Sequence, residues 1–215
     1  MAYGMMLTCL NPCDPKVVAQ LLEPHIQRGD RVIDIGCGIG TTLAWLSEHT
    51  KYTLFGAEPD VELNTEARGN CPTVVFACAG AEDLPFWDWT FDAALMECVF
   101  SLLKDPICAV NELNRVIKPQ GIFVLTDLYT RSRDDLYVGQ SAALPRYIYT
   151  RPTMETFFEK GGFALDSFYD QTTDLGSRLA QMFMDGIVRN CVDDETVKFL
   201  RQLKAGYGIW IWRKA

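Results

Sequence analysis

The chain has 215 residues, of which 28 are acidic and 20 are basic, so its net charge is −8. This length fits one α/β domain with modest additions. The charge argues against a nucleic-acid partner, because binding through phosphates needs a basic surface. No apolar run approaches the length of a membrane span, and residues 1–10 lack the basic start and long apolar run of a signal peptide. We therefore expect a cytoplasmic protein that has no membrane partner.

The first expected helix begins at Asp14-Pro15, since aspartate is a good helix cap and proline suits the first helical position. Its apolar face ends near Arg28-Gly29-Asp30. Strands then alternate with helices, which implies parallel strands joined by right-handed crossovers. The expected strands are 31–35, 52–57, 73–76, 91–96 and 122–126, and the expected helices are 41–48, 61–68 and 105–118.

Beyond Asp127 the alternation loosens. Residues 131–149 are polar and rich in tyrosine, and we interpret them as a lid. Gly161-Gly162 ends a further expected helix. The expected helices of this part are 152–160, 173–189 and 194–204, and the expected strands are 163–169 and 207–212.

A glycine-rich loop, Gly36-Cys37-Gly38-Ile39-Gly40, separates the first strand from the next helix. Glycines allow sharp turns and let a ligand approach the main chain. In open α/β sheets ligands bind at the carboxyl ends of the strands, where this loop is expected. A dinucleotide loop has the pattern Gly-x-Gly-x-x-Gly, and its last small residue would fall on Thr41. This mismatch argues against a nicotinamide cofactor, and thus against the alternative that the protein is a nicotinamide-dependent oxidoreductase.

Glu58 follows the second strand directly. An acid at this place can accept hydrogen bonds from both ribose hydroxyls of a nucleoside. The alternative is a solvated carboxylate at the end of a strand. With the glycine loop on the neighbouring strand, we interpret Glu58 as a nucleoside-binding residue.

Four segments in this order resemble the class I methyltransferases, in particular the small-molecule group that includes quinone-biosynthesis and arsenite methyltransferases. The matching segments are 32–40 (VIDIGCGIG), 81–86 (AEDLPF), 91–95 (FDAAL) and 111–121 (NELNRVIKPQG). The resemblance implies a Rossmann-like α/β fold, with a seven-stranded, mostly parallel sheet, an antiparallel last strand and helices on both faces. It also implies that S-adenosyl-L-methionine is the cofactor and a small molecule is the methyl acceptor.

The resemblance implies one methyltransferase domain, which comprises an N-terminal helix in 1–30, a cofactor-binding core in 31–128, and substrate-side elements with the terminal strands in 129–215. It assigns the methionine end of the cofactor to the glycine loop, the ribose to Glu58, the adenine to the loop at Gly80, and the sulfonium to the end of the fourth strand. The implied cofactor residues are Asp34, Gly36, Cys37, Gly38, Gly40, Glu58, Pro59, Gly80, Ala81, Glu82, Met96 and Glu97.

Two features of the expected adenine loop bear on its role: the residue at position 80 and two nearby tryptophans. Gly80 stands where many relatives have an aspartate, which leaves the contact to adenine with the backbone or with Glu82. Trp87 and Trp89 lie nearby. We expect them to anchor the turn as packed apolar side chains rather than to cover the adenine.

Methyl transfer from a sulfonium is an in-line displacement, and it needs a base only when the acceptor must lose a proton. Neither His25 nor His49 lies at the carboxyl end of a strand. The candidate catalytic residues are therefore Glu97, Asp127 and Tyr129. Glu97 either holds the cofactor ammonium, acts as a base or is structural, and Asp127 either faces the substrate or caps the next segment. The expected acceptor pocket is lined by Tyr129, Tyr137, Tyr147, Tyr149, Phe157 and Phe158.

Cysteine and histidine usage predicts no metal site, because the eight cysteines form no CxxC pair and only two histidines are present. Cys98 matches a metalloid-binding thiol of the arsenite group, but residues 131–149 lack the second cysteine of that group. An arsenite-type reaction at Cys98 is thus one alternative. Another is a sensor or partner subunit that binds S-adenosylmethionine without catalysis.

Overall fold

The computed structural model describes residues 13–139, 145–173 and 204–215. The helices expected over 173–189 and 194–204 therefore lie outside the described residues, apart from their end residues Thr173 and Lys204. The described part is built around a seven-stranded sheet with the strand order β3-β2-β1-β4-β5-β9-β8.

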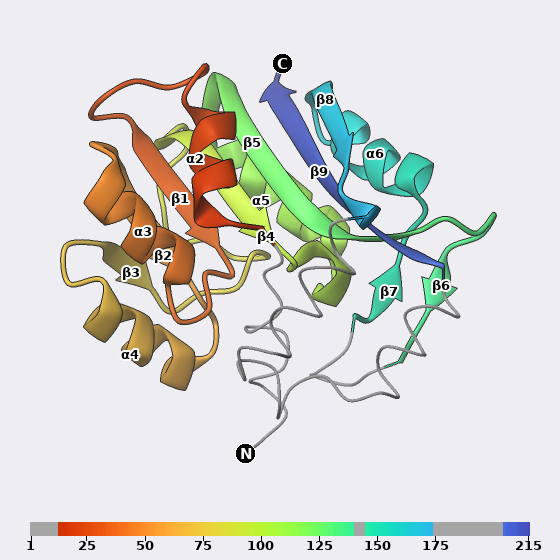
Figure 1. Ribbon diagram of the computed structural model, residues 1–215, viewed down its shortest axis with the longest axis horizontal. Coiled ribbons are helices and arrows are strands. Elements are labelled where there is room, and N and C mark those ends of the chain that lie inside the picture. Colours follow the sequence, from red (N-terminus) through yellow and green to blue (C-terminus); the bar gives the residue numbers. More distant parts are fainter. Residues whose placement is uncertain (1–12, 140–144, 174–203) are drawn as a thin grey trace.

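Five neighbouring strands of the sheet run parallel, and β9 is antiparallel to both of its neighbours (Figure 1). This confirms the expected fold class. The strands of the sheet are β1 (Arg31–Ile35), β2 (Thr53–Ala57), β3 (Val75–Ala77), β4 (Phe91–Glu97), β5 (Ile117–Thr130), β8 (Phe163–Asp170) and β9 (Ala205–Lys214). A separate two-stranded sheet consists of β6 (Leu136–Tyr137) and β7 (Tyr147–Ile148).

Helices pack on both faces of the sheet and enclose two apolar cores. One core joins α2 and α3 to side chains such as Val32, and the other joins α5 and α6 to side chains such as Ile33. The alternation of Val32 and Ile33 between the cores is the two-residue period of a strand. The described helices are α2 (Pro15–Leu22), α3 (Thr41–His49), α4 (Val61–Asn70), α5 (Pro106–Val116) and α6 (Arg151–Lys160), with the 3-10 helix η1 (Phe100–Leu102). None of them is long and apolar enough to cross a membrane.

Helix starts follow the local sequence closely. The Asp14 carboxylate accepts a hydrogen bond from the Lys16 amide at 2.9 Å, and Pro15 opens α2, as expected. Asp60 and Asp105 cap α4 and α5 in the same way. The end of the first helix was predicted wrongly, because α2 stops at Leu22 rather than near Arg28.

The largest correction concerns β5. The helix expected over 105–118 ends at Val116, and β5 begins at once with Ile117 instead of Ile122. The register with β4 moves from Phe91–Ile117 to Ala93–Ile122, so residues 118–121 bulge out of the ladder. The residues between the expected helix and the expected strand thus form a bulge within β5. The strand also continues to Thr130, because β9 pairs with it along 122–130.

Candidate functional site

The glycine-rich loop is held in a shape that glycine suits. Gly36, Gly38 and Gly40 have φ angles of 75°, 54° and 80°, in the left-handed region that L side chains rarely adopt. At Gly36 a Cβ atom would also lie 2.4 Å from Val99 Cγ2, so nothing larger than glycine fits there. The loop therefore passes close to the end of β4, at the carboxyl edge of the sheet.

The amides of this loop are used within the protein. The Gly36 and Cys37 amides donate to Ala57 O at 2.7 and 3.2 Å, and the Gly40 amide donates to Cys37 O at 2.9 Å. Burial raises the pKa of the Cys37 thiol, so Cys37 is a neutral side chain in the loop. These bonds fix the shape of the loop before any ligand binds.

Glu58 links the glycine loop to the next strand–helix connection. Its Oε2 accepts from the Gly38 amide and its Oε1 from the Asp60 amide, both at 3.0 Å. Only 7% of Glu58 is exposed, and burial raises its pKa although the two amide bonds lower it. Glu58 is thus a buried carboxylate and not a solvated one. Each oxygen keeps a lone pair for another donor.

Asp34 lies at the centre of this edge, paired with Gly56 of β2 and Leu95 of β4. Asp34 is 3% exposed, and its Oδ1 has no hydrogen-bond partner among the described residues. Burial raises its pKa well above the ordinary value, and the charges of Glu97 and Glu58 raise it further. Three carboxylates therefore converge here, and a cation bound among them would be strongly favoured.

The loop expected to hold adenine is fastened to the rest of the molecule at several points. Ala81 is buried, and the Glu82 carboxylate accepts from the Lys104 amide at 3.3 Å. At Gly80 a Cβ atom would lie 3.1 Å from Glu82 Oε2. On the ribose side, the Cys78 thiol donates to Pro59 O at 3.6 Å. The Glu82 carboxylate is thus partly engaged within the protein.

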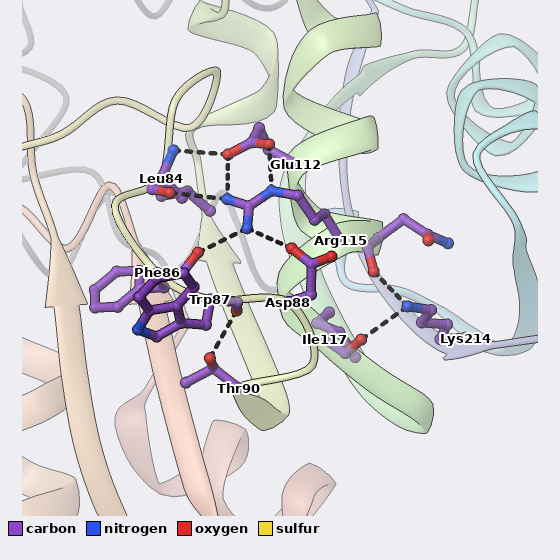
Figure 2. Close-up of polar contacts among 10 residues, drawn as sticks. Leu84, Phe86, Trp87, Asp88, Thr90, Glu112, Arg115, Ile117 and Lys214 are labelled. Carbon is purple, nitrogen blue, oxygen red and sulfur yellow. Dashed lines mark hydrogen bonds and ion pairs between the residues drawn. The ribbon is translucent and has the colours of Figure 1, made fainter.

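Arg115 of α5 clamps the continuation of this loop (Figure 2). Its guanidinium donates to Leu84 O at 2.9 Å and Phe86 O at 2.7 Å, and it pairs with Asp88 at 2.9 Å. Two further bonds, at 2.7 and 2.8 Å, join it to both carboxylate oxygens of Glu112. Glu112 also accepts from the Leu84 amide at 2.8 Å. This clamp holds the loop against α5.

Arg115 and Glu112 lie in segment 111–121, which resembles the methyltransferases, but the sequence alone assigned them no role. The available signal was an acid and an arginine three residues apart on one helix face. The two tryptophans were expected to do this anchoring, and that expectation was wrong. Trp87 and Trp89 are 88% and 60% exposed, so the turn is held by the ion pairs and hydrogen bonds of Arg115 instead.

Asp127 was expected just beyond the fifth strand but lies inside it, fully buried. Its Oδ2 accepts from the Ser101 amide at 2.9 Å and its Oδ1 from the Leu128 amide at 2.7 Å. Burial raises its pKa to about 6, although these bonds lower it. Asp127 therefore holds η1, an earlier segment of the chain, rather than the segment that follows it.

Replacing Asp127 with asparagine should change the pH dependence of stability. The carboxyl has a pKa of about 6 in the fold and an ordinary value of 3.8, so the folded state binds this proton more tightly. Its contribution to the free energy of unfolding therefore falls by on the order of 3 kcal/mol as the pH rises from about 4 to about 6. Urea unfolding at several pH values should show a correspondingly smaller fall for Asp127→Asn than for the wild type. Equal slopes would contradict the assignment.

Glu97 is the last residue of β4, and its charge acts on Asp34. Cys98 follows the strand. Cys98 has a φ of 57° and is 7% exposed, and burial raises the pKa of its thiol well above the ordinary value. A buried neutral thiol is a poor arsenic ligand, which weighs against the arsenite-type alternative. Within the described ranges, no group of three or more His, Cys, Asp or Glu residues could hold a metal ion.

Five of the six aromatic side chains expected at the acceptor pocket lie together. Tyr147 is 5.1 Å from Tyr137 and 5.6 Å from Tyr149, and Phe157 is 5.2 Å from Tyr149, measured between ring centroids. Phe158 joins them through Phe100. Most of these rings belong to the core on the α5 and α6 face or pack against it.

Tyr129 belongs to the same core as Tyr149 and Phe158, but its ring contacts are with residues of β8 and β9. Its ring lies 6.0 Å from Phe168 of β8 and 5.8 Å from Trp210 of β9. Tyr129 is 5% exposed and lies inside β5 rather than after it. The structure thus brings Glu97 next to Asp34 and Glu58, while Tyr129 packs against the antiparallel strands.

Residues 33–125 match the family model described as a methyltransferase domain, and this range covers the glycine loop, Glu58 and the Arg115 clamp. In this range the chain is similar to methyltransferase domains. A demethylmenaquinone methyltransferase of Clavibacter sepedonicus is 28% identical over 153 residues, which cover 67% of this chain and 62% of the relative. The chain spans 41–62% of the length of the first curated relatives that it matches.

Solved structures show the same fold at low identity. The crystal structure of the [4+2]-cyclase SpnF matches this chain with a TM-score of 0.75 and 21% identity, over 99% of this chain and 93% of that one. The phosphoethanolamine N-methyltransferase 2 of Haemonchus contortus, in complex with S-adenosyl-L-methionine, matches with a TM-score of 0.74 and 17% identity, over 93% of this chain and 52% of that one.

Proposed function

We propose that this chain binds S-adenosyl-L-methionine and transfers its methyl group to a small-molecule acceptor. The observation that carries the proposal is the carboxyl edge of β1, β2 and β4, where a preorganised glycine loop meets the three carboxylates Asp34, Glu58 and Glu97. We propose a small molecule rather than a nucleic acid as the acceptor, because a chain with a net charge of −8 repels phosphates.

The residues at this edge fit the charge and the hydrogen-bonding groups of the cofactor. S-adenosylmethionine carries an ammonium and a sulfonium, and a cluster of buried carboxylates attracts such cations. The Oδ1 of Asp34 is a buried acceptor without a donor among the described residues, and we assign it to the ammonium. We assign the spare lone pairs of Glu58 to the ribose hydroxyls.

The bound cofactor supplies an electrophilic methyl group, which the acceptor atom attacks in line. The work of the protein is to align the two groups and to exclude water. Both oxygens of Asp127 already accept backbone hydrogen bonds, so Asp127 serves to position η1. Glu97, partly buried at the end of β4, is our candidate base for an acceptor that must lose a proton.

Calorimetric titration with S-adenosylmethionine tests the proposal, with NAD as the control ligand. We expect saturable binding of S-adenosylmethionine and none of NAD. Glu58→Gln should weaken binding about 10- to 100-fold, since it removes a charged acceptor worth about 1.5–3 kcal/mol. Glu62→Gln, an exposed change in the first turn of α4, is the matched control and should leave affinity unchanged. Absence of binding at millimolar S-adenosylmethionine would refute the proposal.

A second candidate is a protein that binds the cofactor without methyl transfer. It is favoured by the fold match to the [4+2]-cyclase SpnF, because that protein uses a similar fold for another reaction. Incubation with a panel of nucleophilic small molecules separates the two candidates. Formation of S-adenosylhomocysteine supports methyl transfer, whereas tight binding without any of this product supports the second candidate.

A further inference from the structure

Arg146 lies next to the proposed catalytic edge, at the start of β7. Its amide donates to Ser101 O at 2.8 Å, and its own carbonyl accepts from the Val138 amide at 3.0 Å. Ser101 belongs to η1, which follows β4 and is held by Asp127. Figure 1 shows β6 and β7 beyond the carboxyl end of β5. The backbone of Arg146 is therefore fixed beside the segment that follows Glu97.

Arg146 is partly buried and stands directly before β7, among residues that are well packed. Tyr149 belongs to the core, and Tyr147 packs against it. Ile148 is fully buried. The side chain of Arg146 therefore begins beside a packed part of the molecule and is itself partly accessible.

The guanidinium of Arg146 lacks a counter-charge in the described part of the chain. Its Nε is buried without a hydrogen-bond partner there, and none of the five ion pairs found among these residues includes it. Asp127 accepts from two amides and Asp135 accepts from the Thr150 amide at 2.7 Å, and neither carboxylate forms an ion pair with Arg146 in the described residues. The residue as a whole is partly buried, and its shielded Nε leaves hydrogen-bonding capacity for a ligand.

We propose that Arg146 binds an oxyanion group, a carboxylate or a phosphate, carried by the methyl acceptor. The inference rests on the proposed function, which supplies the neighbouring cofactor. Guanidinium matches both groups, because its planar fork of donors bonds two oxygens at once.

The charge pattern of the site supports a defined orientation of such an acceptor. Asp34, Glu58 and Glu97 repel an anion from the cofactor edge, while Arg146 attracts it to the hairpin side. The acidic end of the acceptor is thereby directed to Arg146 and its nucleophilic end to the methyl group. Arg146 acts as a specificity residue for acidic acceptors.

The test uses the full chain with and without saturating S-adenosylhomocysteine, and the probes are sodium phosphate and sodium acetate at constant ionic strength, with sodium chloride as the reference. The readout is the ¹⁵N resonance of Arg146 Nε, identified by its absence in Arg146→Lys. We expect a saturable shift with at least one of the two anions, and the anion with the higher affinity identifies the group. No shift with either anion would overturn the proposal.

Thermal unfolding supplies a second readout through variants. The anion that shifts the resonance should raise the Tm of the wild type and of Arg133→Gln, an exposed arginine in the same segment, but not that of Arg146→Gln. Without added anion, Arg146→Gln should unfold at the wild-type temperature or above it, because the variant loses a shielded donor without a partner. A structural role for Arg146 predicts a lower Tm. An equal anion effect in Arg146→Gln would overturn the proposal. If S-adenosylhomocysteine does not bind, that result contradicts the proposed function and not the role of Arg146. The anion titration of the protein without S-adenosylhomocysteine still tests Arg146 in that case.

Discussion

Replacing Gly36 with alanine should abolish cofactor binding. The φ of 75° costs an L side chain about 1–2 kcal/mol, and the new Cβ would lie 2.4 Å from Val99 Cγ2. The loop must then move, which breaks the bond from the Gly36 amide to Ala57 O and shifts the Gly38 amide away from Glu58. We expect the affinity for S-adenosylmethionine to fall at least about 100-fold, which corresponds to about 3 kcal/mol, in a calorimetric titration.

Two further variants separate the causes of this loss. In Gly36→Ala/Val99→Ala the nearest methyl groups of Val99 are gone while the backbone strain stays, so affinity should recover in part. Gly69→Ala is the matched control, because Gly69 lies in α4 and its Cβ would meet open space. It should leave affinity unchanged and stabilise the helix by up to about 1 kcal/mol. Wild-type affinity of Gly36→Ala would show that the loop does not hold the ligand.

Replacing Arg115 with methionine should give the largest loss of stability. The change leaves Glu112 without its cation and removes the donors to Leu84 O and Phe86 O. Because the Arg115 side chain is 31% exposed, we expect the free energy of unfolding to fall by about 3 kcal/mol. This value is at the low end of the range for breaking a fully buried ion pair. In a chain of this size this loss lowers the Tm by roughly 6–12 °C in calorimetric unfolding. The freed loop should also weaken cofactor binding.

Matched variants test whether the clamp itself is the cause. Arg115→Lys keeps the charge without the fork and should be intermediate, and Arg115→Met/Glu112→Leu should recover part of the stability because no unpaired carboxylate remains. Lys118→Met, which breaks the more exposed pair with Asp92, should cost less than about 1 kcal/mol. An effect of Arg115→Met no larger than that of Lys118→Met would contradict the clamp.

The clamp also predicts a pH dependence with a definite sign. Hydrogen bonding to Arg115 holds the pKa of Glu112 below its ordinary value of 4.5. The stabilisation is therefore complete above pH 4.5 and is lost as the pH falls through the lowered value. The difference in stability between wild type and Arg115→Met should shrink in the same range.

Local features of this protein follow from its sequence alone. Asp14-Pro15 predicted the start of α2, the apolar pattern predicted β1, β2 and β4, and the glycine spacing predicted the loop at Gly36. These features depend on steric limits and hydrogen bonds between residues a few positions apart. Glu58 and Glu97 were likewise expected at the carboxyl edge of a parallel sheet, whereas the role of Asp34 was implied by the resemblance to methyltransferases.

Other features depend on partners that are distant in the chain, and only the tertiary structure decided them. Pairing with β9 extends β5 and buries Asp127 inside a strand, where its polar character had indicated an end. Arg115 fastens a loop about thirty residues earlier, which leaves the two tryptophans exposed. A bond to Ser101 sets Arg146 beside the site. No local pattern encodes which long side chain reaches a distant carbonyl or stays without a partner, because that depends on how complete elements pack.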